Sequence, residues 1–327
     1  VGQSLTSTCP DQVVTEVAGD VPAPVKLVDV LPSPALLASF KATSCPTGTT
    51  IVVPAFTYPV TLAFNEPGLE GIQLSPKAVA GILNGTVKTW DDPVITATNE
   101  GLALDGLPPM KLVGLKSDQG SVQAITAWLK ATAPDVWKAG IIGSVPAAQN
   151  FDSVAKLIDS ITTVEGEIAV LPVTTANNNV LGMASFPAGP NMDVWVTSDD
   201  VQLAKVGSAA ITDQTSTLAG GESKDMLIYG PGIGGVPVEG QFNLAASKIV
   251  LSDGQELIGW PVMGVAHLLV CNDKANPMPL SFAQYLVRLA GQGSLEAFGV
   301  TPLPEPIRFK TFAPLQVNTA ANAGSAG

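Results

Sequence analysis

The spacing of apolar residues along the chain predicts strands that alternate with helices. β-Branched and aromatic residues dominate the run TTIVVPAFTYPVTLAFN at 49–65, which predicts a strand whose two prolines lie at edges or bends. Shorter apolar runs predict further buried strands at 110–115, 168–173 and 258–272. Residues 1–50 are irregular in pattern, because repeated prolines break any long helix there.

Helical spacing of apolar residues is found in segments 75–85, 120–133, 151–161 and 279–293. The first of these has the clearest boundaries, with Ser75 as N-cap, Pro76 in the first turn and Gly85 just past the end. Strands that alternate with helices are typical of an α/β architecture with largely parallel pairing.

The composition supports a globular chain and argues against several classes of partner. Of the 327 residues, 46% are hydrophobic and 13% are charged, so the chain can bury a substantial core. The net charge of −12, with no basic cluster, argues against nucleic acid and anionic membranes. A small anion remains compatible with this charge, since a few fixed N–H donors outweigh a distant surface charge. Every apolar run of membrane-spanning length is interrupted by Gly, Pro or polar residues, so no transmembrane span is expected.

The ends of the chain and its cysteines favour a secreted protein. Val1 follows no charged and apolar leader, so we expect either a removed signal or a fragment of a longer chain, and the tail NTAANAGSAG resembles a flexible linker. Of the three cysteines, Cys9 and Cys45 lie in turn-rich surroundings and are the expected disulfide pair, whereas Cys271 ends an apolar strand. The alternative is that all three are reduced.

Several motifs occur in a familiar order. They are VTLAFNEPGLEGIQLSPKAVAGILNGTVKTWDDPVI, LVGLKSDQGS, AKLIDSITTVEGEIAVLPV, GWPVMGVAHLLV and AFGVTPLP, and together they run from about residue 50 to residue 305. This order resembles the phosphate-specific substrate-binding proteins of ABC transporters, and KTWDDP is the most specific part of the match. The resemblance is specific for a fold and says less about the ligand.

The resemblance implies a type-2 periplasmic-binding-protein fold of the α/β class. Two lobes with mixed, largely parallel sheets are then joined by two hinge crossings near 60–68 and 257–264, and the ligand lies between them. The implied first lobe is formed by 1–64 and 260–315, and its N-terminal part is short for a complete lobe. The implied second lobe is 65–259, and a flexible tail follows at 316–327.

The loop KSDQGSV aligns with the family's phosphate-binding loop, Arg-Ser-Asp-Gly-Ser-Gly-Thr, and thereby implies an oxyanion site. Ser117 and Asp118 are retained, whereas Lys116 replaces an Arg and loses its planar fork. Gly and Ser are exchanged in order, and Val122 cannot donate the hydroxyl bond of the family's Thr. The implied ligand-binding residues are Lys116, Ser117, Asp118, Gly120 and Ser121, with phosphate or a similar small oxyanion bound weakly or with altered specificity. The alternative interpretation is that Ser117 or Asp118 only caps the following helix.

The two other ligand loops of the family are not recognisable ahead of residue 50, where GDVPAPVK at 19–26 offers only a Pro-Ala-Pro similarity. We therefore expect either that the first lobe has lost its ligand half, or that its missing elements come from an upstream part of a longer precursor or from another chain. An ABC permease is the partner that the family implies. The alternative function is a cell-surface or assembly protein that keeps the fold as a scaffold.

No catalytic arrangement is visible in the sequence. His267 is the only histidine and lies in an apolar run, which indicates a core position. We therefore expect a non-enzymatic protein without metal or cofactor, located in the periplasm, outside the cell or at the cell surface.

Overall fold

A computed structural model of the chain describes ten segments. They are residues 23–147, 149–188, 194–196, 226–228, 232–233, 248–250, 256–258, 260–295, 300–303 and 305–317. Cys9 lies outside these segments, as do residues 318–327 of the predicted tail.

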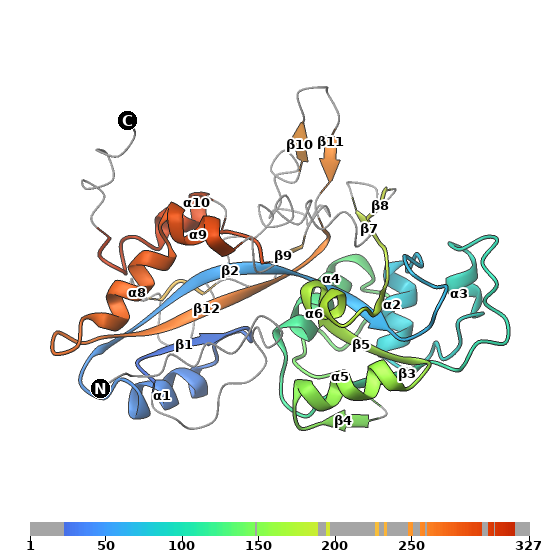
Figure 1. Cartoon of the computed structure of the whole chain (residues 1–327), viewed down its shortest axis with the longest axis horizontal. Helices are drawn as coiled ribbons and strands as arrows, with labels where there is room; N and C mark the ends of the chain where they lie inside the picture. Colours follow the sequence, from blue (N-terminus) through green and yellow to red (C-terminus); the bar gives the residue numbers. More distant parts are fainter. Residues whose placement is uncertain are drawn as a thin grey trace.

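Two long antiparallel strands, β2 (Thr49–Phe64) and β12 (Val262–Asn272), form the centre of the molecule (Figure 1). Every residue of β2 after Thr49 is buried, as expected for a strand covered on both faces. The register shifts by one residue where Ala266 pairs with Phe56 and His267 with Pro54. Pro54 thus lies at a β-bulge, where its missing N–H costs no ladder bond.

The main sheet has the strand order β1-β12-β2-β5-β3-β4, with β6 and β9 paired to β2 and β12. The α/β class and the mixed sheet are confirmed. Parallel pairing is confined to β3 with β4 and β3 with β5, where helices α4 and α5 provide the crossovers that parallel strands need. The remaining pairings in this sheet are antiparallel, because the long strands β2 and β12 run in opposite directions through its middle.

The bounds of the other strands are β1 Val25–Val28, β3 Lys111–Leu115, β4 Gln149–Phe151, β5 Glu167–Pro172, β6 Gly182–Met183, β7 Phe186–Ala188, β8 Val194–Val196, β9 Gly232–Ile233, β10 Lys248–Val250 and β11 Glu256–Ile258. The helices are α1 Pro34–Thr43, α2 Pro76–Leu83, α3 Pro93–Thr96, α4 Gly120–Thr132, α5 Val154–Thr163, α6 Val173–Asn178, α8 Met278–Leu286, α9 Leu289–Leu295 and α10 Glu305–Lys310. Within the described segments, no helix has the length and apolar character that crossing a bilayer would require.

The part of residues 1–50 that the structure describes is more regular than expected. It contains strand β1 and the ten-residue helix α1. Pro34 begins this helix instead of breaking it, because the first helical position needs no N–H donor. Ser33 is the N-cap, and its hydroxyl oxygen accepts the N–H of Leu36 at 3.2 Å.

Elements gather around both ends of the central strands (Figure 1). β1, α1 and α8 to α10 lie around one end, whereas α2 to α6 and β3 to β5 lie around the other. Strand β2 changes its partner between these two groups, from β12 as far as Pro59 to β5 from Val60 onward. The limits of the two lobes given above stay a prediction.

Aromatic residues connect the crossing strands to α4. The indole N–H of Trp260 donates to the carbonyl oxygen of Val60 at 2.8 Å, beside the change of partner in β2. The ring of Phe186 lies 5.9 Å from that of Trp260 and 5.2 Å from that of Trp128 on α4. All three rings are fully buried, so α4 is anchored to the crossing by the core itself.

A disulfide joins Cys45 to Cys271, with 5.2 Å between their Cα atoms. The expected pairing of Cys9 with Cys45 is therefore wrong. The physical reason is the antiparallel register, in which Thr50 pairs with Cys271, so that the segment leading into β2 lies beside the end of β12. Gly48 permits this approach, since a Cβ at that position would lie 2.7 Å from the sulfur of Cys271.

We expect the double variant Cys45→Ser, Cys271→Ser to lower the free energy of unfolding by about 2–5 kcal/mol, because the bond closes a very long loop in the unfolded chain. Denaturant unfolding measures this loss. Cys9→Ser serves as the matched control and should leave the midpoint unchanged. A cross-linked peptide containing residues 9 and 45, found by mass spectrometry without reduction, would contradict the assignment.

Candidate functional site

Several buried polar groups lie at the N-terminus of α4. Strand β3 ends at Leu115, and the helix begins at Gly120 with Gln119 as its N-cap residue. The side chain of Gln119 makes no capping bond. Since the first N–H groups of a helix have no partner within the helix, this end needs an acceptor from elsewhere.

Asp29 provides that acceptor from the first part of the chain. It follows β1 directly, and its Oδ2 accepts the N–H of Gly120 at 3.0 Å across 91 residues of sequence. In the opposite direction, Oε1 of Gln123 on α4 accepts the N–H of Leu31 at 2.7 Å. The interpretation that Ser117 or Asp118 caps α4 is thus replaced by a long-range cap from the turn between β1 and α1.

Tyr58 on β2 lies against the same helix end. A Cβ on Gly120 would lie 2.5 Å from the Tyr58 hydroxyl oxygen and would also collide with the backbone of Asp29, so only glycine fits there. Gly264 on β12 is the register partner of Tyr58, and a side chain at that position would overlap the tyrosine ring. The two glycines therefore allow the ring and the turn to approach α4 closely.

Three buried polar groups near this helix end have no hydrogen-bond partner among the described residues. They are the hydroxyl groups of Tyr58 and Ser121 and the Nε2 of Gln119. Each of these residues is at most 2% exposed. Buried polar groups in native proteins are nearly always bonded, so an unpaired cluster at a helix N-terminus indicates a place for an acceptor.

Burial changes the acid–base properties of this cluster. Desolvation raises the pKa of Asp29 to about 7, although hydrogen bonds from Gly120 and from the turn's own N–H groups oppose the shift. Desolvation also raises the pKa of Tyr58 well above its usual value, and the nearby Asp29 charge adds to this shift. Asp29 therefore changes its charge near neutral pH, whereas Tyr58 stays a neutral hydroxyl donor.

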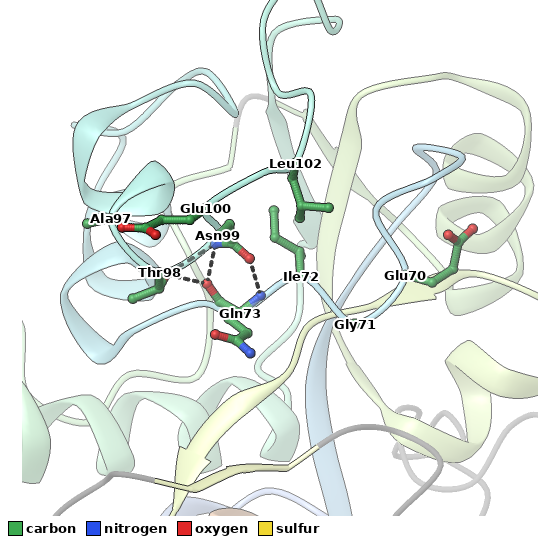
Figure 2. A pocket seen from close by; sticks show the side chains of 9 residues that line it. All are labelled: Glu70, Gly71, Ile72, Gln73, Ala97, Thr98, Asn99, Glu100 and Leu102. Carbon is green, nitrogen blue, oxygen red and sulfur yellow. Dashed lines mark hydrogen bonds between the residues drawn. The ribbon is translucent and has the colours of Figure 1, made fainter.

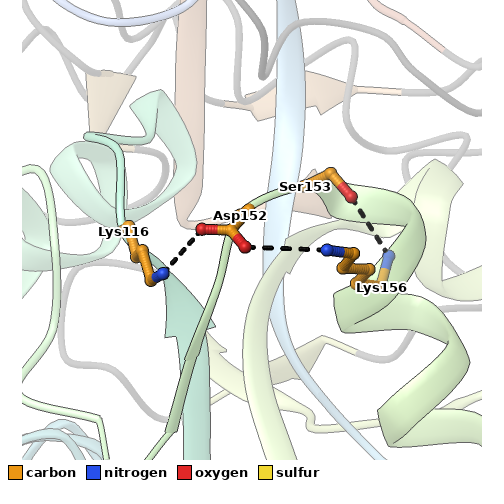
Figure 3. A network of polar contacts seen from close by, with 4 residues as sticks. All are labelled: Lys116, Asp152, Ser153 and Lys156. Atoms are coloured by element: carbon orange, nitrogen blue, oxygen red, sulfur yellow. Dashed lines mark hydrogen bonds and ion pairs between the residues drawn. The ribbon is translucent and has the colours of Figure 1, made fainter.

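The predicted site residues divide into an exposed group and a buried group. Lys116, Ser117 and Asp118 are exposed, whereas Gly120 and Ser121 are buried in the first turn of α4. Lys116 is directed toward Asp152 ahead of α5, with 2.6 Å between Nζ and Oδ1, and both side chains are more than 60% exposed (Figure 3).

The charge of Lys116 is paired with the carboxylate of Asp152. The hydrogen bond and the charge of Lys116 lower the pKa of Asp152, with a smaller contribution from Lys156, whose Nζ lies 3.6 Å from Oδ2 (Figure 3). Ser153, the N-cap of α5, accepts the backbone N–H of Lys156. Lys116 therefore belongs to a surface ion-pair network, and such pairs contribute little to stability.

The sequence interpretation missed Asp29, Tyr58 and Gln123. The first-lobe turn was sought at 19–26, whereas a turn of the chain that faces α4 lies between β1 and α1. The pair Ser33-Pro34 was a usable signal, because an N-cap residue followed by proline is typical of a helix start. Recognising it would have placed a turn directly ahead of that helix.

A hollow of about 570 Å³ lies beside the loop after α3, away from this helix end. Its lining comes from the segments around Gly71 and Asn99, and the Asn99 amide is bonded to both backbone groups of Gln73 at 2.8 Å (Figure 2). Thr98 donates to the same Gln73 carbonyl. These polar groups hold two loops together, so the hollow offers no comparable set of unpaired donors.

The described segments contain no metal-ligand cluster, and the one histidine lies in the core. No cluster of three or more potential metal ligands occurs within them. His267 is buried on β12, and desolvation lowers its pKa to about 3, so the imidazole is neutral at physiological pH. The core position expected for His267 is confirmed.

No protein-family model matches the chain. The phosphate-binding protein PstS 3 of Mycobacterium leprae is 30% identical over 83 residues, which cover 25% of this chain and 22% of that protein. The phosphate-binding protein PstS 2 of Mycobacterium tuberculosis is 24% identical over 268 residues, which cover 78% of this chain and 63% of that protein. The chain thus spans less than two thirds of the length of these relatives.

Solved structures show the same fold at low sequence identity. The periplasmic phosphate-binding protein PfluDING, determined with bound phosphate, has a TM-score of 0.59 and 17% identity over 88% of this chain and 78% of its own. A human phosphate-binding apolipoprotein has a TM-score of 0.57 and 16% identity over 88% and 79%. A phosphate-binding protein from Stenotrophomonas maltophilia has a TM-score of 0.53 and 15% identity over 87% and 77%. The chain is therefore a divergent relative of the phosphate-binding proteins and has their fold over most of its length.

Proposed function

We propose that the chain binds a phosphate-type oxyanion weakly at the N-terminus of α4, between this helix and the turn after β1. The observation that carries the proposal is the set of buried, unpaired groups of Tyr58, Gln119 and Ser121 beside a helix N-terminus. Hydroxyl and amide groups donate hydrogen bonds to an oxyanion, and the helix end adds a partial positive charge. The site would thus bind an anion without any cationic side chain.

The affinity is expected to be weak because no cationic side chain faces the anion at this helix end. Lys116 is exposed and paired with Asp152, and the Asp29 carboxylate already occupies the Gly120 N–H. A charge-assisted hydrogen bond contributes about 1.5–3 kcal/mol, so its absence corresponds to roughly a tenfold to hundredfold loss of affinity. The chain's net charge of −12 also disfavours the approach of an anion.

The names of the similar proteins support a solute-binding role. The curated relatives are phosphate-binding proteins, and one solved neighbour is described as periplasmic. We extend this to a non-enzymatic protein in the periplasm, outside the cell or at its surface, which delivers its ligand to an ABC permease. Lys116, Ser117 and Asp118 would have to turn from solvent toward the ligand to take part in binding. Variants at these positions that change the affinity would show that they do.

Calorimetric titration of inorganic phosphate into the full chain tests the site, with sulfate as a second anion. We expect Ser121→Ala to weaken phosphate binding about tenfold to hundredfold, because it removes one hydrogen bond to an anion. Ser117→Ala is the matched control, since it removes the same hydroxyl group from the exposed side of the loop and should change the affinity less than Ser121→Ala.

Two results would count against this placement. Equal losses in Ser117→Ala and Ser121→Ala, together with a loss in Lys116→Ala, would move the ligand to the exposed loop that the sequence resemblance indicates. An absence of heat with either anion, in the wild type and in Asp29→Asn alike, would reject oxyanion binding.

A second candidate function is assembly of the chain with a second copy of itself. The observation that favours it is an apolar stripe on α8 and at the start of α9, formed by Met278, Phe282, Tyr285 and Leu289, whose exposed fractions are 73%, 38%, 56% and 74%. No carboxylate occurs between Asp273 and Glu296, so two copies of this acidic chain could meet here without repulsion between carboxylates. The same stripe on both copies would form a two-fold interface.

Sedimentation velocity over a range of protein concentrations tests this assembly. If the stripe forms the interface, Tyr285→Asp should raise the dissociation constant of the dimer at least about tenfold, because a charge is expensive to bury there. Leu102→Asp is the matched control, since Leu102 is also exposed, at 44%, but lies in the loop after α3. A wild-type chain that stays monomeric at all concentrations would reject this function.

A further inference from the structure

The Asp29 carboxylate occupies the position that a bound anion would take. The N–H of Gly120 is the first donor of α4, and it points to Oδ2 of Asp29 at 3.0 Å. A carboxylate and an oxyanion compete for the same N–H, because both are favoured by the positive end of the helix. The chain therefore contains an internal anion at its own binding site.

A second bond holds the turn of Asp29 in place. Leu31 donates its N–H to Oε1 of Gln123, one turn further along α4, at 2.7 Å. Together, the two contacts tie the β1–α1 turn to α4 from both sides, one with the helix as donor and one with the helix as acceptor. These two hydrogen bonds thus hold the β1–α1 turn against α4 in the absence of a ligand.

The groups around Asp29 do not neutralise its charge. On α4, the adjacent residues Gln119, Gly120, Ser121 and Gln123 are uncharged. On β2 the neighbour is the neutral Tyr58, and on β12 it is His267, which pairs with Val28 and whose low pKa keeps it neutral. Lys116 and Asp118 lie on the exposed side of the loop ahead of α4. Desolvation is therefore the largest influence on Asp29 and raises its pKa to about 7.

Resting on the oxyanion function proposed above, we propose that Asp29 is a latch that competes with the anion for the Gly120 N–H and yields the site when it is protonated. Protonation removes the charge that favours Asp29 at the helix end and removes its repulsion of the incoming anion. The unpaired Tyr58 hydroxyl then offers the anion a further donor beside the freed N–H. Binding is consequently strengthened by acid.

The test compares the wild type with Asp29→Asn by calorimetry at about pH 5.5 and about pH 8, on either side of the Asp29 titration. Sulfate is the first probe, because its charge does not change in this range. If only the protonated latch admits the anion, wild-type affinity falls about tenfold between the two pH values, since about a tenth of Asp29 is protonated at the higher one. Asp29→Asn should bind with the same affinity at both pH values and about tenfold more tightly than the wild type at the higher one.

Phosphate is the second probe. Because phosphate itself changes its charge near neutral pH, the readout is the ratio of two affinities measured at the same pH. The ratio of wild-type to Asp29→Asn affinity at each pH cancels the change in the ligand. Asp135→Asn is the matched control, because it removes the same charge from an exposed position beyond the other end of α4 and should follow the wild type. Equal affinities and equal pH dependence in the wild type and Asp29→Asn would overturn the latch while leaving oxyanion binding intact.

A readout without ligand separates the latch from the oxyanion function. The amide signal of Gly120, followed by NMR with labelled glycine, should shift with a midpoint near the Asp29 pKa of about 7 in the wild type and stay constant in Asp29→Asn. If no anion binds either protein, the oxyanion function fails and the latch fails with it, whereas a titrating Gly120 amide would still show that protonation of Asp29 alters this bond. A Gly120 amide that does not titrate in the wild type would overturn the latch.

Discussion

The antiparallel pairing of β2 with β12 is the constraint on which the other features of this molecule depend. The two strands are buried almost throughout, so a slip of one residue would turn every side chain to the opposite face. Their register brings Cys45 to Cys271 at one end and places Tyr58 opposite Gly264 further along. It also sets Trp260 beside Val60, where β2 changes its partner. One pairing thus determines the positions of the disulfide, the crossing and one wall of the proposed anion site.

The N-terminus of α4 would have two roles, one in the fold and one in the proposed binding of an anion. A helix N-terminus needs an acceptor for structural reasons, and Asp29 meets this need for α4. The same acceptor position gives an oxyanion its strongest fixed dipole. A side chain that completes the fold therefore lies at the proposed anion site, and if an anion binds there, the stability that Asp29 gives the fold and the affinity for the anion oppose each other. This opposition does not arise in a site whose donors are left free by the fold.

Local signals in the sequence predicted local structure well. β3, α2, α4 and α5 lie where apolar spacing and capping residues placed them, and motif order indicated the fold that the solved neighbours confirm. Contacts between distant residues were not predictable, because no local pattern records which segments pair. Asp29 meets Gly120 across 91 residues and Cys45 meets Cys271 across 226. Lys116 shows a second limit of the sequence. Its alignment with a ligand-binding Arg of the family does not reveal that its side chain turns toward Asp152.

The disulfide has a consequence for the order of events during synthesis. Cys45 leaves the ribosome long before Cys271, which follows it by 226 residues, whereas Cys9 has already been made. In an oxidising compartment the thiol of Cys45 therefore meets the wrong partner first, and bonds form and exchange there through thiolate attack. The final pairing requires either that β2 shields Cys45 until β12 arrives or that an isomerase corrects an early bond to Cys9. Oxidative maturation of this chain thus depends on keeping Cys45 from Cys9 until β12 has been made, or on exchange of an early bond afterwards.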